Sequence, residues 1–191
     1  RRQRQMCIRD SNYILDSVFG VNDKIYRTQY TMSNGYIADA ILFAPAPLGT
    51  IAIDSKFPLE HYQIMTDTKQ DKSVRDAATK AFKSDVKKHI DAIRSKYIIP
   101  GETASEAIMF LPAEAIFAEI NAYHNDLIEY SYKSKVWICS PTTLMSTLTT
   151  IGMILKNMER DKYAKVIHEE LNKLGAEFTR YRDRWLSLIH I

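Results

Sequence analysis

The feature that most constrains the fold is a run of three strand-like segments followed directly by one long helical segment. Residues 26–32 and 36–43 flank the turn sequence Ser33-Asn34-Gly35, and residues 50–53 follow after a loop that holds prolines and a glycine. Asn-Gly supplies the positive φ values that tight hairpins require. The three segments therefore predict consecutive strands of one sheet.

A long amphipathic segment then covers residues 71–97. Its apolar residues recur every three or four positions, the spacing of one helix face: Val74, Ala78, Phe82, Val86, Ile90, Ile93 and Tyr97. Short apolar runs at 107–111 and 136–139 are each followed by a helical pattern. Ser140 and Pro141 suit the N-cap and the first residue of the second of these helices.

The order of these segments predicts an α/β fold, with a mixed sheet flanked by helices. Residues 163–185 add a C-terminal amphipathic helix whose apolar positions alternate at spacings of four and three. That spacing is typical both of a helix packed on a domain and of the start of a coiled coil. The predicted organisation is a core over residues 12–160 and a C-terminal helix over residues 161–185.

The two ends of the chain differ in character from this core. Residues 1–11 resemble a read-through translation of a sequencing adapter, and residues 186–191 resemble its opposite strand, so we expect both segments to be non-native. The chain holds 26 Lys and Arg against 23 Asp and Glu, but residues 1–11 contain four of the former and one of the latter. Without them the charges balance, so net charge gives no indication of a nucleic-acid partner.

Composition indicates an ordinary globular protein, with 46% hydrophobic and 26% charged residues. No apolar run reaches the roughly 18 residues that a membrane helix needs. Cys139 stands apart from Cys7, so neither a disulfide framework nor a zinc spacing is indicated. We expect a cytoplasmic location and no membrane contact for this part of the chain, and leave open a membrane anchor upstream of it.

Two acidic residues and a lysine lie on or beside the predicted strands. Asp39 interrupts an apolar strand, and Asp54 and Lys56, two residues apart, project from one side of an extended chain. If the strands are neighbours, the three side chains converge. Two carboxylates can hold Mg²⁺, while a lysine orients the attacking water or stabilises the charge of a phosphorane-like transition state. The group therefore suits phosphodiester cleavage.

A structural ion pair at the sheet edge is the alternative interpretation of these residues. An exposed pair between Asp54 and Lys56 would contribute roughly 0–1 kcal/mol. We favour the metal site because an acid between Ala38 and Ala40 is costly to bury without a partner or a metal.

Several stretches of the chain are similar to known sequence patterns. The spacing of Asp39 and Asp54-x-Lys56 is similar to the PD-(D/E)xK signature of restriction-endonuclease-like folds. Longer words resemble the RmuC family in order and spacing over nearly all of residues 12–165: Ile53-Asp54-Ser55-Lys56-Phe57-Pro58-Leu59-Glu60-His61-Tyr62, Lys88-His89-Ile90, Lys96-Tyr97-Ile98, Met109-Phe110-Leu111-Pro112 with Glu114, and Ser140-Pro141-Thr142-Thr143-Leu144.

The resemblance implies a bacterial DNA recombination protein whose core is a nuclease-like domain with a restriction-endonuclease-like mixed sheet. Asp39, Asp54 and Lys56 would be catalytic, Asp39 and Asp54 would hold Mg²⁺, and DNA would be the partner, with no small-molecule cofactor. The family often carries an upstream coiled coil, which offers a route to oligomers outside this chain. Two alternatives stay open: a non-catalytic DNA-binding or scaffolding module of the same fold, and a helical interaction protein whose match is accidental.

The chain departs from the pattern in two places. Ala38 stands where the signature name has proline, and residues 1–11 largely replace the first core helix, which in such folds frequently offers a glutamate to the metal. Both departures bear on whether the chain as given can cleave DNA.

The basic face of the 71–97 segment can either follow a DNA backbone or be a solvated face interleaved with acids, and we favour the second. Its members are Lys80, Lys83, Lys87, Lys88, Arg94 and Lys96. We expect His89 to be a packed or hydrogen-bonded histidine rather than a ligand.

The remaining polar candidates have structural explanations. Glu114 and Glu119 could add acid to the site, but Glu114 falls in a first helical turn, where a carboxylate favours the macrodipole. Ser140 and Thr142 suit a helix start, and Cys139 suits a buried apolar position.

Overall fold

The structure, a computed structural model, describes residues 2–44, 46, 49–55, 57 and 59–189, with side chains from residue 8 to residue 180. The chain divides into two compact units, Arg1–Thr150 and Ile151–Ile191. Each unit is described by itself. The predicted division between residues 160 and 161, and the predicted non-native ends, stay predictions.

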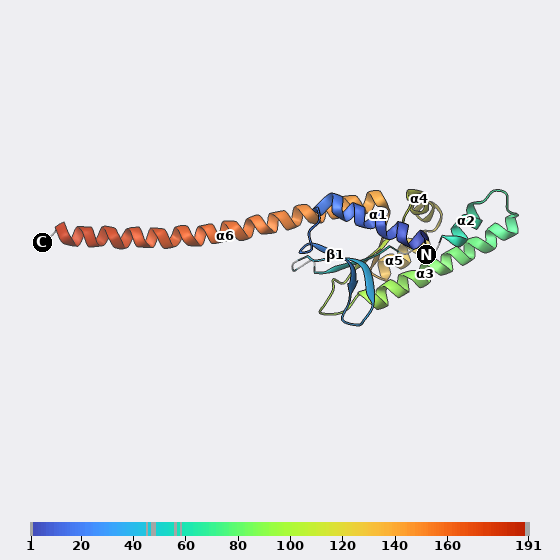
Figure 1. The fold of residues 1–191 in the computed structure, drawn as a ribbon, viewed down its shortest axis with the longest axis horizontal. Coiled ribbons are helices and arrows are strands. Elements are labelled where there is room, and N and C mark those ends of the chain that lie inside the picture. The colour runs from blue at the N-terminus through green and yellow to red at the C-terminus, as the bar shows by residue number, and fades with distance from the viewer. Residues whose placement is uncertain (1, 45, 47–48, 56, 58, 190–191) are drawn as a thin grey trace. The chain divides into compact units, whose positions relative to one another are not determined.

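A five-stranded mixed sheet forms the centre of the first unit (Figure 1). Its strands lie in sequence order: β1 (Tyr26–Thr31), β2 (Ile37–Leu42), β3 (Ile51–Asp54), β4 (Ala107–Phe110) and β5 (Val136–Cys139). The first three are antiparallel to one another, whereas β3, β4 and β5 run parallel. The predicted α/β class and mixed sheet are confirmed, with strand bounds within about one residue of those expected.

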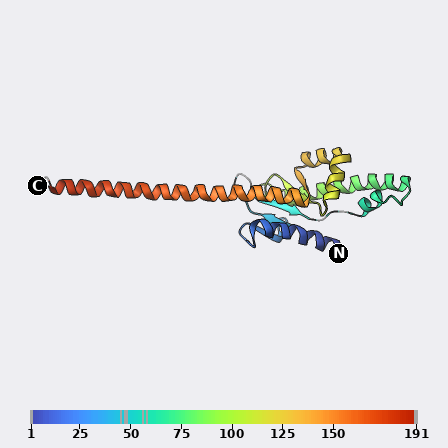
Figure 2. The same ribbon diagram turned by 90° about the horizontal axis from the view of Figure 1, so that it is seen from above.

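Helices cover both faces of this sheet. The helices of the described residues are α1 (Arg2–Phe19), α2 (Glu60–Thr66), α3 (Lys72–Tyr97), α4 (Glu114–Tyr123), α5 (Asn125–Lys133) and α6 (Pro141–Ile189), and of α6 only residues 141–150 belong to the first unit. Figure 2 shows α1 on one side of the strands and α3 on the other. No helix in the described part of the chain combines the length and apolarity needed to cross a membrane.

The buried face of α3 matches the predicted stripe at six of its seven positions: Ala78, Phe82, Val86, Ile90, Ile93 and Tyr97. Val74 is the exception and is 42% exposed. The stripe packs on a core that includes Ile41, Ala52 and Met109 from three neighbouring strands. This packing holds α3 against the face of the sheet that carries Ile41, Ala52 and Met109.

The hairpin between β1 and β2 differs in detail from the expected one. Gly35 has a φ of 81°, whereas Asn34 does not adopt a positive φ. The N–H of Gly35 donates to the carbonyl of Met32, and the N–H of Met32 donates to the carbonyl of Tyr36. A connection with one left-handed residue is the three-residue kind, a type I turn closed by glycine.

The helix that begins at Pro141 is longer than expected. The N–H of Thr143 donates to the Ser140 hydroxyl at 3.3 Å, and the N–H of Ser140 donates to Thr143 Oγ1 at 2.7 Å, which confirms Ser140 as the N-cap. Leu144 and Leu148 are buried in the first unit. The helix does not stop before residue 163 but continues to Ile189. In the second unit its large apolar side chains are exposed, among them Ile167, Leu171, Leu174 and Phe178.

Candidate functional site

Strand register brings Asp39 and Asp54 together. Ala40 pairs with Ile53 across the antiparallel β2–β3 ladder, so the same register continued by one residue sets Asp39 opposite Asp54. Side chains that are directly opposite on neighbouring antiparallel strands share one face of the sheet. The two residues are 1% and 7% exposed. Lys56, the third predicted site residue, lies outside the described residues.

Asp54 occupies the carboxyl end of β3, the central strand. Its other neighbour in the sheet is Met109 of the parallel strand β4. In open α/β sheets, ligands bind outside the carboxyl ends of strands. The sequence therefore places an acid where an α/β sheet offers a binding site.

Gln29 and Ser55 are among the residues that hold the Asp39 carboxylate. Its Oδ2 accepts the backbone N–H of Ser55 at 2.9 Å, and its Oδ1 accepts Nε2 of Gln29 at 3.2 Å. Gln29 lies in β1 with a φ of 49°, a left-handed conformation that is rare for a residue other than glycine. The strained backbone of Gln29 thus coincides with a contact to the site, and no pattern in the sequence predicted it.

The Asp54 carboxylate faces α3. The Tyr97 hydroxyl donates to Asp54 Oδ1 at 3.2 Å and lies 2.9 Å from the carbonyl oxygen of Ile37. His89 Nε2 lies 3.1 Å from Asp54 Oδ2. Their side chains are mostly buried, and this contact falls short of hydrogen-bond geometry, so neither atom has a hydrogen-bond partner among the described residues. Buried polar atoms without hydrogen bonds are costly, and a bound ion or ligand is one way to satisfy them.

A cavity of about 600 Å³ opens beside this pair. It lies between the start of β2, the end of β3 and one face of α3, and its polar lining consists of Tyr36, Asp54, Asp85, Lys88, His89, Lys96 and Tyr97. Three of the words that resemble the RmuC family contribute to it, through Asp54, through Lys88 and His89, and through Lys96 and Tyr97. Asp54 of β3 therefore meets residues of α3 that lie more than thirty positions further along the chain.

His89 was expected to be a packed or hydrogen-bonded side chain, and it does lie packed beside the apolar face of α3. What the sequence did not reveal is its neighbour, because the contact with Asp54 joins α3 to β3. The resemblance of Lys88-His89-Ile90 to the family was the signal that could have drawn attention to it.

The donor set near Asp39 and Asp54 bears on the expected metal. Across the described residues, no group of three or more His, Cys, Asp or Glu side chains is placed to hold an ion. Two carboxylates are nevertheless a fitting set for Mg²⁺, which usually binds one or two carboxylates and completes its octahedron with water and substrate phosphate. The residues present therefore fit Mg²⁺ better than a metal that needs a full protein cage.

On the other face of β3, α1 reaches the residue that follows Asp54. The Ser11 and Ser55 hydroxyl oxygens lie 2.7 Å apart, and both residues are fully buried. Within residues 8–19 the acids are Asp10 and Asp16, and Asp16 accepts a hydrogen bond from the Tyr26 hydroxyl. This part of α1 therefore offers no glutamate to the site.

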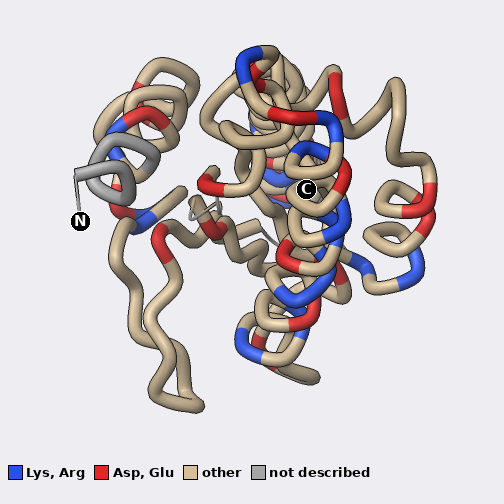
Figure 3. The backbone as a smooth tube through the Cα atoms, turned by 90° about the vertical axis from the view of Figure 1, so that its right-hand side faces the viewer, with Lys and Arg blue, Asp and Glu red and all other residues tan. Residues whose placement is uncertain are grey.

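Four of the six members of the basic face of α3 fall into two groups. Lys83 and Lys87 contact Asp126 of α5, with Nζ–carboxylate distances of 2.8 and 3.4 Å. Lys88 and Lys96 instead line the cavity. Figure 3 shows basic and acidic residues interspersed along the helices. Two lysines of α3 are therefore set apart by their position, and the expectation that its basic face is simply solvated stays a prediction.

The other polar candidates lie away from this cavity. Glu114, in the first turn of α4, accepts the N–H of Thr142 at 2.7 Å, and the hydrogen bonds from Thr142 lower the pKa of this carboxyl. Glu119 Oε1 lies 3.6 Å from His124 Nε2. Burial raises the pKa of the Cys139 thiol to about 11, so this residue behaves as an apolar side chain at neutral pH.

Comparison with known proteins supplies a family. The model of the RmuC family matches residues 12–189. The DNA recombination protein RmuC of Escherichia coli strain K12 is 27% identical over 165 residues, which cover 83% of this chain and 34% of that protein. A DNA recombination protein RmuC homolog of Chlamydia trachomatis is 29% identical over 150 residues, covering 74% of the chain and 33% of the homolog.

The chain spans about a third of the length of these curated relatives. A homolog of the same name from Xylella fastidiosa strain Temecula1 is 26% identical over 135 residues, 69% of the chain and 29% of the homolog. No solved structure matches the chain significantly.

Proposed function

The chain belongs to the RmuC family, and we propose from this premise that its core hydrolyses DNA phosphodiesters with Mg²⁺, through Asp39, Asp54 and Lys56. We also assign the core to the restriction-endonuclease-like folds. The order of the five strands supports that assignment, with one acid in the second strand and one at the end of the third.

The observation that carries the proposal is the pair of buried acids on adjacent strands. Two neighbouring carboxylates repel each other, and burial costs each of them its hydration. A divalent cation bound between them offsets both effects. Asp39 and Asp54 would hold Mg²⁺ through their carboxylate oxygens, and the bound ion would polarise the scissile phosphate and lower the pKa of the attacking water.

The surrounding residues keep these carboxylates in position. The Ser55 N–H fixes Asp39 Oδ2, and the Tyr97 hydroxyl fixes Asp54 Oδ1 while it also contacts the backbone of β2. Lys56 would orient the water or stabilise the negative charge that develops on the phosphate. Ligands held by other groups lose little conformational freedom when the substrate binds.

A non-catalytic DNA-binding module is the second candidate. It is favoured by the small number of carboxylates near the pair, since the described residues contain no cluster of three metal-binding side chains. Under this proposal the fold would bind DNA and leave its phosphodiesters intact.

Nicking of supercoiled plasmid by the full 191-residue chain distinguishes the two. With Mg²⁺ we expect nicking by the wild-type protein and its loss in Asp54→Asn and Asp39→Asn, while both variants still bind DNA. Asp76→Asn is the matched control, because Asp76 is an exposed acid on α3 away from the cavity. A wild-type protein that binds every DNA tested and cleaves none would favour the binding module.

A further inference from the structure

Two lysines of the cavity have their charges available for a ligand. In the described part of the chain, neither Lys88 nor Lys96 lies within 4.0 Å of a carboxylate, in contrast to Lys83 and Lys87. The two carboxylates in the cavity lining are each faced by a histidine: Asp54 by His89 and Asp85 by His61, the latter at 2.6 Å. The carboxylates of the cavity therefore contact histidines and do not neutralise its lysines.

The spacing of these lysines suits a chain of phosphates. They lie eight residues apart on α3, which corresponds to about 12 Å along the helix axis. That length matches about three to four nucleotides of a stacked strand. A polyanion can contact both lysines with neighbouring phosphates along its length.

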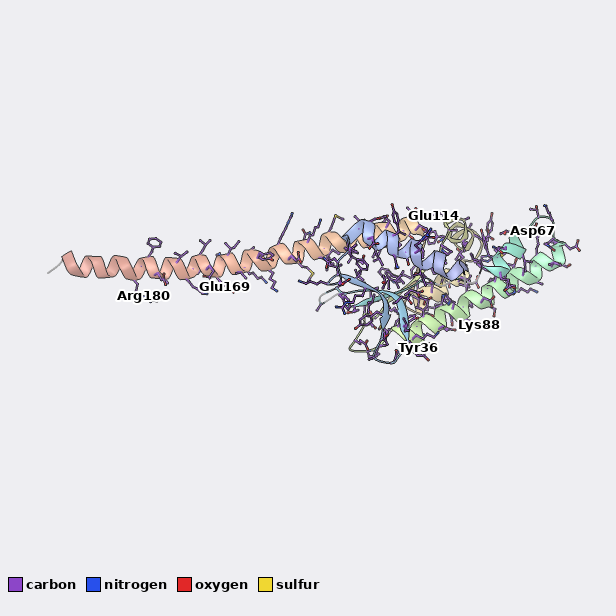
Figure 4. The ribbon with its side chains drawn as sticks, in the orientation of Figure 1. Tyr36, Asp67, Lys88, Glu114, Glu169 and Arg180 are labelled. Carbon is purple, nitrogen blue, oxygen red and sulfur yellow. The ribbon has the colours of Figure 1, made fainter. Side chains whose placement is uncertain are left out.

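The aromatic ring of Tyr36 lies beside Lys96 in the same cavity. Tyr36, just before β2, is 49% exposed, and the Lys96 Nζ lies 5.5 Å from the centre of its ring. Asn34 Nδ2 donates to the carbonyl of Lys96 at 2.8 Å, which ties the hairpin turn to α3. Figure 4 labels Tyr36, which directly precedes β2, and Lys88, which lies on α3. The ring is therefore held next to a cation and remains open to solvent.

We infer that this cavity binds a single strand of DNA, with phosphates at Lys88 and Lys96 and a base stacked on Tyr36. A basic groove joined to an aromatic platform is the usual construction of single-strand sites. A duplex cannot use the platform, because its base faces are already covered by stacking. The strand would pass the Asp54–His89 pair, which lines the same cavity.

The inference rests on the proposed function for the identity of the substrate, but binding needs no cleavage. Fluorescence anisotropy of a labelled oligothymidylate, with the full chain in EDTA and at several salt concentrations, measures it directly. We expect the Lys88→Ala/Lys96→Ala double variant to bind more weakly. The slope of log affinity against log salt should fall in magnitude by about 1.4, since each phosphate contact on a single strand contributes about 0.7. Lys80→Ala, an exposed lysine on the same helix, is the control and should match the wild type.

Tyr36 provides the second arm. Tyr36→Ala should weaken binding roughly 5- to 150-fold, the range observed when one base loses its aromatic partner, whereas Tyr36→Phe keeps the ring and should bind normally. Circular dichroism of each variant verifies the fold. Equal affinity for the oligonucleotide and its duplex, with Tyr36→Ala unaffected, would overturn the inference. If the wild-type protein shows these binding effects but does not nick DNA, the nuclease proposal fails while this inference stands. The two failures are therefore distinguishable.

Discussion

Asp39 has a structural role that can be separated from its proposed chemistry. In Asp39→Ala the N–H of Ser55, a fully buried residue, loses its acceptor, which costs about 1–3 kcal/mol. Asp39→Asn keeps an oxygen in the same place. Gln29 is exposed, so its amide can turn to water in either variant. Effects common to both substitutions, including relief of repulsion with Asp54, cancel in the comparison. We therefore expect the Ala variant to be less stable than the Asn variant by about 1–2 kcal/mol.

Urea unfolding of the full chain, followed by far-ultraviolet circular dichroism, measures this difference. With a denaturant dependence of about 2 kcal/mol/M, the two midpoints should differ by roughly 0.5–1 M, Ala unfolding first. Both variants should lack Mg²⁺-dependent nicking, since neither offers a carboxylate at position 39. Coincident midpoints, or an Asn variant that unfolds before the Ala variant, would show that Asp39 does not satisfy the Ser55 N–H.

Two further predictions concern the core. Burial lowers the pKa of His124, which packs against the Phe82 ring at 5.7 Å between centroids. The unfolded chain therefore binds this proton more readily, so the stability due to neutral His124 is complete above the unperturbed histidine pKa of about 6.5 and is lost as pH falls below it. Thermal unfolding at about pH 7.5 and about pH 5.5 should show a smaller decrease in His124→Gln than in the wild type; equal decreases would contradict this. Phe82→Ala should cost about 3–5 kcal/mol in urea unfolding, because the side chain is fully buried, whereas Val74→Ala should cost under about 0.5 kcal/mol; similar losses would refute the assignment of faces on α3.

Elements whose signals are local were predicted well. Strands β2 to β5 each contain apolar residues, β1 is indicated by the hairpin turn that follows it, and the stripe on α3 repeats over many turns. Helix α5 was not predicted because it is only nine residues long and follows α4 after a single residue, so its apolar positions span little more than two turns. The full length of α6 was not predicted either, because polar residues separate its two apolar patterns. Polar residues do not end a helix, and α6 continues through them.

The acids of the site were predictable and their partners were not. Asp39 and Asp54 stood out because each interrupts or ends an apolar strand, and antiparallel neighbours bring such residues face to face. Tyr97 was assigned to the core stripe, where its ring does lie, but its hydroxyl contact with Asp54 depends on how α3 packs on the sheet. The contact of His89 with Asp54 and the left-handed φ of Gln29 depend on the same tertiary arrangement.

The site is divided between two elements with different chemistry. The sheet supplies the acids that suit a metal, while α3 supplies the lysines that suit phosphates. Tyr97 joins them, because its ring packs in the core while its hydroxyl contacts both Asp54 and the backbone of β2. Packing of the α3 stripe would therefore fix the distance between the proposed metal and the proposed DNA strand, and a shift of α3 along the sheet would move Lys88 and Lys96 together relative to Asp54. A core substitution far from the cavity that shifts α3 would on this basis lower the proposed activity, although no residue of the site itself is substituted.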